Sequence, residues 1–419
     1  MSHRSAGAIR FRPPRVVAPP AVRWMLQRAF GPLDAPFLEP LDPEAALAAA
    51  RRFETSARLA ARQGARRLAA ELGPAAAALQ RDRAAATALG LRLSAVAGEV
   101  ATAAAPLGIP LVFLKFAALT ATGVSAPGAR AACDVDVLVP AAAAPELQRA
   151  LLARGWRPSG MPEGEHQLPA LVHARGGVVE VHRLLLGVRL AGGGSATAGE
   201  LARRGLLEPL PELPGDCAVP SREVQAAHTL VHGLGQHGWW PGSYPLLRMV
   251  ADLIDLGIGM GGIGGIGGKG GAALAAAAAA LVARDVTAGE AAAAAALCAA
   301  LAAGDDLLAD PGDPRGEAVL LRHILAGRLD PDYAAALRLG LFRAQPSDRP
   351  PAWRLARLML GAVFLSRAQV DAIYGVPRQP FGYLGRRLWR PFDLLRRLGR
   401  YGARTVRLRL DGEVNIPKS

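Results

Sequence analysis

Two aspartates, Asp134 and Asp136, stand one residue apart in the otherwise apolar segment "CDVDVLVP". Side chains alternate between the two faces of a β-strand, so a strand here would place both carboxylates on one face and Val135 and Val137 on the other. Neighbouring carboxylates repel each other, and a divalent cation between them would remove the repulsion. Mg²⁺ prefers one or two protein carboxylates, with water and substrate phosphates completing its coordination. The alternative is an edge strand on which the pair faces water.

A third carboxylate stands in the segment "GGVVEVHRLL", where Glu180 again interrupts an apolar run. Strand alternation puts Glu180 and His182 on one face and the flanking valines on the other. If this strand lies beside the first, three carboxylates converge, as a two-metal site for phosphoryl transfer requires. Glu180 as an ordinary surface residue is the alternative, and His182 is expected to support the site rather than to react.

The surrounding segments predict a small mixed α/β sheet. The apolar runs "IPLVFLKF" and "CDVDVLVP" are typical of strands, "AAAAPELQRALLARGW" is typical of an amphipathic helix, and "ALVHARGGVVEVHRLL" predicts a hairpin that turns at Gly176 and Gly177. Helical patterns stand before and after these segments. The earlier one begins at Asp42, an expected N-cap, and ends at Gly73.

Taken in order, "GIPLVFLKFAAL", "PGARAACDVDVLVP", "ALLARGW" and "VVEVHRLL" resemble the uncharacterised bacterial nucleotidyltransferases of the DNA polymerase beta superfamily. Members of that family carry a Lys-Gly pair after an apolar strand, an Arg shortly before Asp-x-Asp-x-Leu-Val, and a strand similar to "VELH". The later segments "HTLVHGLGQHGWW" and "RMVADLIDLG" are similar to the family's helical region with spaced histidines. The resemblance covers residues 95 to 260.

The resemblance implies an α+β fold, with a small mixed sheet of nucleotidyltransferase palm type flanked by helical N- and C-terminal regions. It implies that an acceptor hydroxyl attacks the α-phosphate of a nucleoside triphosphate such as ATP, with Mg²⁺ bound and pyrophosphate leaving. The acceptor would be a small molecule, a peptide or a protein. The residues to which it assigns roles are Asp134, Asp136 and Glu180 for catalysis and metal binding, Lys115 and Arg130 for nucleotide binding, and His182 as support.

One position departs from the family pattern, because Phe116 follows Lys115 where the family has glycine. A glycine lets the backbone approach a triphosphate closely, since it has no Cβ. Two alternative functions therefore stay open: a catalytically weakened accessory or binding protein on the same fold, and a nucleotidyltransferase that modifies RNA.

The net charge of +14, mostly from arginine, is compatible with phosphate-bearing ligands, nucleic acid or an anionic membrane, and also with an arginine-rich composition that serves no partner. Heavy use of Ala, Gly, Arg and Pro is typical of a bacterial genome rich in G and C. Three widely spaced cysteines predict neither a disulfide framework nor a zinc site and favour a reducing cytoplasm. The sequence has neither a signal-peptide pattern nor a strongly apolar run of about 20 residues, so we expect no transmembrane segment.

The pattern of the chain predicts six regions. They are a disordered tail at 1–20, a helical region at 21–95, the nucleotidyltransferase-like core at 96–215, a helical region closing the cleft at 216–256, a glycine-rich linker at 257–271, and a helical C-terminal region at 272–419 with a basic amphipathic end. The glycine-rich segment lacks the spacing of a phosphate-binding Walker A loop. The basic end could bind nucleic acid or a membrane surface, although a surface helix docked by its apolar side is favoured.

Two further sets of polar residues stand in the region at 216–256. His228 and His232 are four residues apart, with His237 following, but zinc needs further ligands, so we expect packing histidines that line the cleft opposite the sheet. Asp252 and Asp255 are expected on a helix surface or paired with Arg248.

Overall fold

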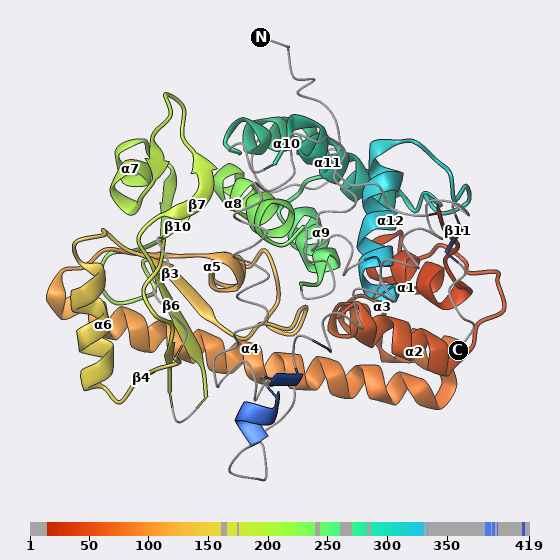
Figure 1. The fold of residues 1–419 in the computed structure, drawn as a ribbon, viewed down its shortest axis with the longest axis horizontal. Coiled ribbons are helices and arrows are strands. Elements are labelled where there is room, and N and C mark those ends of the chain that lie inside the picture. The colour runs from red at the N-terminus through yellow and green to blue at the C-terminus, as the bar shows by residue number, and fades with distance from the viewer. Residues whose placement is uncertain are drawn as a thin grey trace.

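The computed structural model describes residues 15–160, 166–173, 176–238, 244–259, 270–282, 286–330, 333, 382–386, 388–389, 392 and 413–414. A mixed sheet forms one side of the molecule and a group of helices forms the other, and the long helix α4 (Ala76–Ala104) runs beneath both (Figure 1). The fold is therefore of the α+β class, as expected.

The N-terminal region consists of helices, as predicted. They are α1 (Pro20–Phe30), α2 (Pro43–Arg52), α3 (Ser56–Leu72) and α4, with a 3₁₀ turn at Gly73–Ala75. The Asp42 side chain caps α2 by accepting the Glu44 N–H at 3.0 Å, which satisfies one of the amides that a helix start leaves unpaired. Regular structure begins before residue 21, the expected start of the helical region. Helix α1 starts at Pro20, and a two-residue strand, β1 (Arg15–Val16), precedes it. Strand β1 pairs with β11 (Glu413–Val414), and its Val16 is buried.

The central sheet has seven short strands in the order β4-β5-β6-β3-β2-β10-β9. Their bounds are β2 (Leu111–Phe113), β3 (Val135–Leu138), β4 (Arg157–Pro158), β5 (Leu171–Val172), β6 (Val178–His182), β9 (Leu207–Pro209) and β10 (Cys217–Pro220). Strand β3 pairs antiparallel with β2 and parallel with β6, and β5 and β6 form the predicted hairpin. Gly176 and Gly177 in its turn both have positive φ, which glycine adopts without strain.

The two faces of this sheet are different in character. Val135 and Val137 of β3 and Val179 and Val181 of β6 are fully buried in a core shared with α4 and α6 (Ala144–Ala153). Because side chains alternate, the polar residues of the same two strands emerge on the opposite face. That face looks toward the later helices.

Those later helices are α8 (Arg222–Leu230), the π-helical turn η3 (Val231–Gln236), α9 (Leu246–Asp255), α10 (Gly271–Ala280), α11 (Ala288–Ala303) and α12 (Gly316–Leu329). In the chain, the small strand pair β7 (Leu185–Arg189) and β8 (Ser195–Ala196) and the short helix α7 (Ala198–Arg203) lie between β6 and β9 of the sheet. Helices α8 and α9 lie in the middle of the molecule, between the sheet and the N-terminal helices (Figure 1).

Three of the expected region boundaries need adjustment. The sheet continues past residue 215, since β10 pairs with β2, and the expected boundary at 95 falls inside α4. Most of the expected linker lies outside the described residues, and α10 begins at Gly271. The basic amphipathic end also lies largely outside them.

One helical stretch is long and apolar enough to cross a membrane, although no transmembrane segment was expected. It covers residues 56–107, and its most apolar 18-residue window has a mean hydropathy of 1.2 with 39% of the window buried. The alanines of α4 account for the hydropathy. Since one face of α4 packs against the sheet through Leu93, Val96 and Val100, we interpret it as a core helix, a class that can be equally long and apolar.

Candidate active site

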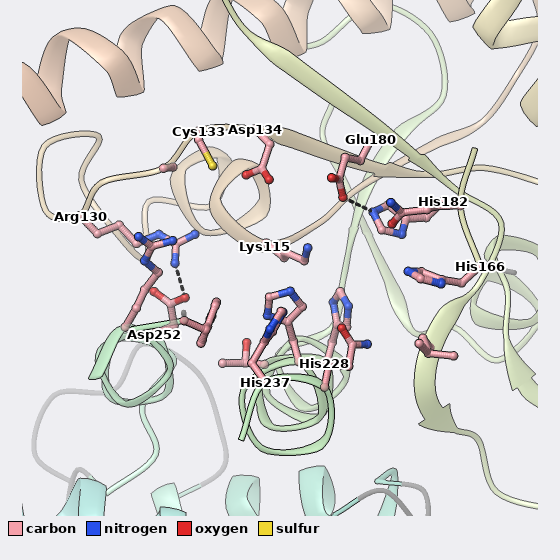
Figure 2. A pocket seen from close by; sticks show the side chains of 18 residues that line it. Lys115, Arg130, Cys133, Asp134, His166, Glu180, His182, His228, His237 and Asp252 are labelled. Atoms are coloured by element: carbon pink, nitrogen blue, oxygen red, sulfur yellow. Dashed lines mark hydrogen bonds and ion pairs between the residues drawn. The ribbon is translucent and has the colours of Figure 1, made fainter. Parts of the chain in front are cut away.

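A cavity of about 350 Å³ lies between the polar face of the sheet and the helical layer formed by α8, η3 and α9. Figure 2 shows its two walls, with Asp134 and Glu180 on the sheet side, His228 and His237 on the helical side, and Lys115 between them. Five of the chain's eight histidines line it. The cavity therefore gathers the polar residues that the sequence placed in separate segments.

The carboxylates of Asp136 and Glu180 come together through strand pairing. Asp136 lies opposite Glu180 in the parallel register of β3 and β6, which meets the condition that the sequence left open, that the two strands be neighbours. Asp136 is 1% exposed, while Glu180 is half-buried and lines the cavity. Glu180 thus presents its carboxylate to the cavity, whereas Asp136 lies behind the side chains that cover it.

One of these covering side chains is Lys115, whose ammonium donates to Asp136 Oδ1 at 2.8 Å. Lys115 is the first residue of α5 (Lys115–Ala121), separated from β2 by Leu114 alone. Its φ is +48°, a conformation that a residue with a side chain rarely adopts. Such strained residues occur where the surrounding structure fixes them, often at functional sites. Burial disfavours the ammonium, but the charge of Asp136, the hydrogen bond to it and the charges of Asp134 and Glu180 together outweigh burial and raise the pKa of Lys115, which keeps it cationic.

The other covering side chain is His182, whose Nε2 lies 2.9 Å from Asp136 Oδ1 and 3.6 Å from Glu180 Oε2. Burial opposes protonation of this imidazole, but its bonds to the two carboxylates outweigh burial and raise its pKa. For Asp136, burial likewise opposes ionisation, and Lys115 with His182 lowers the carboxyl's pKa below the ordinary value. Asp136 is therefore ionised, and Lys115 and His182 both bond to its Oδ1.

Asp134 lies one residue before β3 rather than inside it, and its side chain lines the cavity (Figure 2). Its pKa is raised, first by burial and then by the negative charge of Asp136 and Glu180, against the attraction of Lys115. The expected placement of both aspartates on one strand is thus corrected at Asp134, although the side chain reaches the cavity.

Arg130 comes from the loop before β3 and also lines the cavity, where its Nη1 lies 2.5 Å from Asp252 Oδ2 on α9. Its guanidinium carbon stands 5.4 Å from the centre of the Phe116 ring. Phe116 is 2% exposed, belongs to the core on the far face of the sheet and is not among the residues that line the cavity. The bulky residue beside Lys115 therefore leaves the cavity open.

The expectation that Asp252 and Asp255 lie on a helix surface or pair with Arg248 is wrong. Asp252 pairs with Arg130, Asp255 pairs with Arg58 of α3 at 2.8 Å, and Arg248 pairs with Glu54 at 2.5 Å. These three ion pairs tie α9 both to the loop before β3 and to the N-terminal helices.

The helical wall carries His228, His232 and His237, with Tyr244 just before α9. The interpretation that these histidines line the cleft opposite the sheet is confirmed. Burial, with Lys115 as the next cause, lowers the pKa of all three, that of His228 to about 3, so the imidazoles are neutral. The neutral histidines thus face, across the cavity, the charged wall formed by Lys115, Asp134, Glu180 and His182.

The donor set at the sheet wall fits a divalent cation. Within the described part of the chain, the group of potential ligand atoms that converge consists of Asp136, Glu180 and His182, all within 4.8 Å of one another. Hard cations prefer the carboxylate oxygens of such a group. Asp134 adds a further carboxylate on the same cavity wall.

Comparison with known proteins shows the family to which the chain belongs. A family model described as "Uncharacterised nucleotidyltransferase" matches residues 39–256, just over half of the sequence. The chain belongs to this nucleotidyltransferase family. The match spans α2 to α9 and so includes both walls of the cavity. No curated protein and no solved structure matched the chain.

The predicted residues Lys115, Arg130, Asp134, Glu180 and His182 all line the cavity, and Asp136 lies behind them. His166, Gln167 and Tyr244 line the cavity, and Asp252 fixes Arg130, without having been assigned there. His166 precedes β5 in a loop that gives no periodic signal, and only the tertiary fold brings Asp252 to a residue 122 positions earlier.

Proposed function

We propose that the protein transfers a nucleoside monophosphate from a nucleoside triphosphate to an acceptor hydroxyl in a reaction that depends on Mg²⁺. The observation that carries the proposal is the pairing of Asp136 with Glu180 on adjacent parallel strands, with Lys115 on the same carboxylate. Membership of the nucleotidyltransferase family supports a nucleotide substrate.

Asp134, Asp136 and Glu180 would hold the cation, which supplies positive charge for the phosphates when it is bound. His182 orients Asp136 through its hydrogen bond, as residues behind a metal ligand commonly do. The cation would take over the charge compensation of Asp136, so Lys115 could turn its ammonium toward the phosphates in the same cavity. Arg130, held by Asp252 and Phe116, lies on the cavity wall as a second cation.

In this reaction the acceptor oxygen forms a bond to the α-phosphorus, and the bond from that phosphorus to the pyrophosphate oxygen breaks. The acceptor hydroxyl gives up its proton, and pyrophosphate leaves. The chain's own residues contribute mainly by position and charge, since phosphoryl-type transfers require little covalent chemistry from the protein. A small molecule, a peptide or a protein could present the hydroxyl.

Calorimetric titration with each of the four nucleoside triphosphates, with and without Mg²⁺, tests the proposal. We expect at least one to bind only when Mg²⁺ is present, and Glu180→Gln to weaken that binding by about tenfold or more. Glu212→Gln, which changes an exposed carboxylate away from the cavity, is the matched control and should bind as the wild type does. Failure of all four nucleotides to bind would contradict the proposal.

A further inference from the structure

Two aromatic rings of the helical wall lie face to face. The rings of His237 and Tyr244 are parallel to within 11°, with centroids 4.6 Å apart. His232 stands edge-on to both, at 4.6 Å from His237 and 5.1 Å from Tyr244. The guanidinium carbon of Arg248 lies 6.0 Å from the centre of the Tyr244 ring. Tyr244 is thus held from several sides, and it backs His237 at the cavity wall.

The π-helical turn η3 brings His237 to this position. At about 100° per residue, an unbroken α-helix would place His232 about 40° from His228 but His237 about 180° from it, on the opposite side. Residues 231–236 instead form a π turn, in which each residue advances the helix by less. The wider turn rotates His237 back toward the cavity, where it lies beside His228 (Figure 2). π turns of this kind frequently occur at functional sites.

His228, His232 and His237, which together form the histidine wall of the cavity, are not arranged as a metal site. Their imidazole nitrogens are not among the converging ligand atoms found within the described part of the chain, which belong to the opposite wall. Burial and the charge of Lys115 lower the pKa of His237, so its ring is uncharged. An uncharged aromatic ring on a cavity wall is suited to contact with the face of another planar ring.

The distribution of charge indicates which ring this is. Phosphates belong near Lys115, which lies between the two walls (Figure 2). A nucleoside triphosphate carries one planar ring, its base, separated from the phosphates by a ribose. Lys115 and His237 line the same cavity, so a nucleotide with its phosphates near Lys115 would have its base in the cavity that His237 lines. Gln236 lines the cavity directly beside His237 and offers an amide to the base edge.

We propose that His237, backed by Tyr244, stacks against the nucleobase of the nucleoside triphosphate. This inference rests on the proposed function and adds the subsite for the base. Stacking on an aromatic side chain is sequence-tolerant, since every base has a π-face, and contributes about 1–3 kcal/mol per base. The larger face of a purine leads us to expect tighter binding of ATP and GTP than of CTP and UTP.

The test compares a ligand that has a base with one that does not. Calorimetry in Mg²⁺ would measure the binding of ATP and of tripolyphosphate to the wild type, His237→Ala and His237→Phe. We expect His237→Ala to weaken ATP binding by about tenfold, the middle of the stacking range, and to leave tripolyphosphate binding within about twofold. His237→Phe keeps an aromatic face and should retain ATP binding within about threefold. His173→Ala, a histidine that packs on Trp156 outside the cavity, is the matched control and should change neither affinity.

The outcomes separate the two proposals. If wild-type protein binds no nucleoside triphosphate, the proposed function fails and the base subsite fails with it. If the wild type binds ATP and His237→Ala binds it equally well, only the base subsite is overturned. Equal loss of ATP and tripolyphosphate in His237→Ala would also overturn it, because His237 would then act on the phosphates or on the fold.

Discussion

At the scale of single residues, the candidate site brings three carboxylates together, and their mutual repulsion disfavours ionisation unless positive charge compensates it. Burial, and then the negative charges of Asp136 and Glu180, raise the pKa of Asp134. Lys115 and His182 both bond to Asp136. The two aspartates therefore differ: the charge of Asp136 is stabilised by its partners, whereas the charged form of Asp134 is disfavoured by burial and by the neighbouring carboxylates. Such a disfavoured charge is typical of functional sites.

This difference predicts opposite effects of two similar substitutions. Asp136→Asn removes the charged partner of Lys115 and His182 and should lower the free energy of unfolding by about 3 kcal/mol. Asp134→Asn removes a repelled charge and should raise it by about 0.5–1 kcal/mol, while Mg²⁺-dependent nucleotide binding falls. Urea unfolding curves of both variants and the wild type measure the effect. Equal destabilisation by the two substitutions would contradict the assignment of their charges.

At the scale of elements, alternation and strand pairing explain why the charged wall could be predicted. A residue pair with period two in an apolar run fixes which side chains share a face, and Gly176 and Gly177 mark the turn of the β5–β6 hairpin. The parallel pairing of β3 with β6 then set Glu180 opposite Asp136. Alternation and the glycine turn are local signals that the sequence contains, whereas the pairing of β3 with β6 joins strands far apart in the chain and comes from the fold.

The histidine wall shows what local signals could not supply. The spacing of His228 and His232 indicated a shared helix face, but only the π turn brings His237 to that face. Likewise, the partner of Asp252 is set by how α9 packs against the loop before β3. Strand β10 escaped prediction because it has only four residues and no alternation of polar and apolar types.

The close packing of η3 against α9 can be tested at Gly233. A Cβ at this position would lie 2.3 Å from Met249 Sδ and 2.8 Å from its Cγ, and Met249 is fully buried. Gly233→Ala should therefore destabilise the protein by about 1–3 kcal/mol and weaken nucleotide binding through displacement of the histidine wall.

Adding Met249→Ala should recover part of this loss, because the side chain that blocks the new methyl group is then gone. Gly98→Ala in α4, where a Cβ meets nothing within 4 Å, is the matched control and should stabilise the protein by about 0.5–1 kcal/mol. Strict additivity of the Gly233 and Met249 substitutions, measured by urea unfolding, would contradict this packing account.

At the scale of the whole molecule, the helices outside the sheet hold the second wall of the cavity. Arg58 of α3 pairs with Asp255, and Glu54 pairs with Arg248 and with Arg328 of α12. His323 of α12 lies 2.8 Å from the Gly238 carbonyl oxygen, next to His237, and 3.0 Å from the Tyr333 hydroxyl. Because a carbonyl only accepts, His323 donates from Nε2 and accepts from Tyr333 at Nδ1, as a neutral imidazole does. The C-terminal helices thus support the cavity without lining it.

This arrangement makes stability depend on pH through His323. Burial lowers its pKa to about 4 from an unfolded value of 6.5, despite the bond to Gly238. Between pH 6.5 and pH 4 the unfolded chain binds a proton that the folded chain does not. The contribution of His323 to stability is therefore complete above pH 6.5 and declines as the pH falls, by about 1.4 kcal/mol per pH unit.

His323→Phe removes this titration, so the variant should be less stable than the wild type at pH 7.5, with the difference shrinking at pH 5. Urea unfolding at the two pH values measures the free energy of unfolding of each protein. The other buried histidines are the same in both proteins, so their contributions cancel in the difference. A stability difference that is the same at both pH values would contradict the neutral, buried state of His323.

The most direct test of nucleotidyl transfer compares two preparations of the same nucleotide, one radiolabelled on the α-phosphate and the other on the γ-phosphate. The protein is incubated with Mg²⁺, an acceptor-containing cell extract and its preferred nucleoside triphosphate, labelled on the α- or on the γ-phosphate. We predict that α-label becomes attached to an acceptor and γ-label appears in pyrophosphate, and that Asp134→Asn and Glu180→Gln each reduce transfer by about 100-fold or more, while Glu212→Gln does not. Transfer of the γ-label to an acceptor, or no transfer of α-label by protein that binds the nucleotide, would contradict the account.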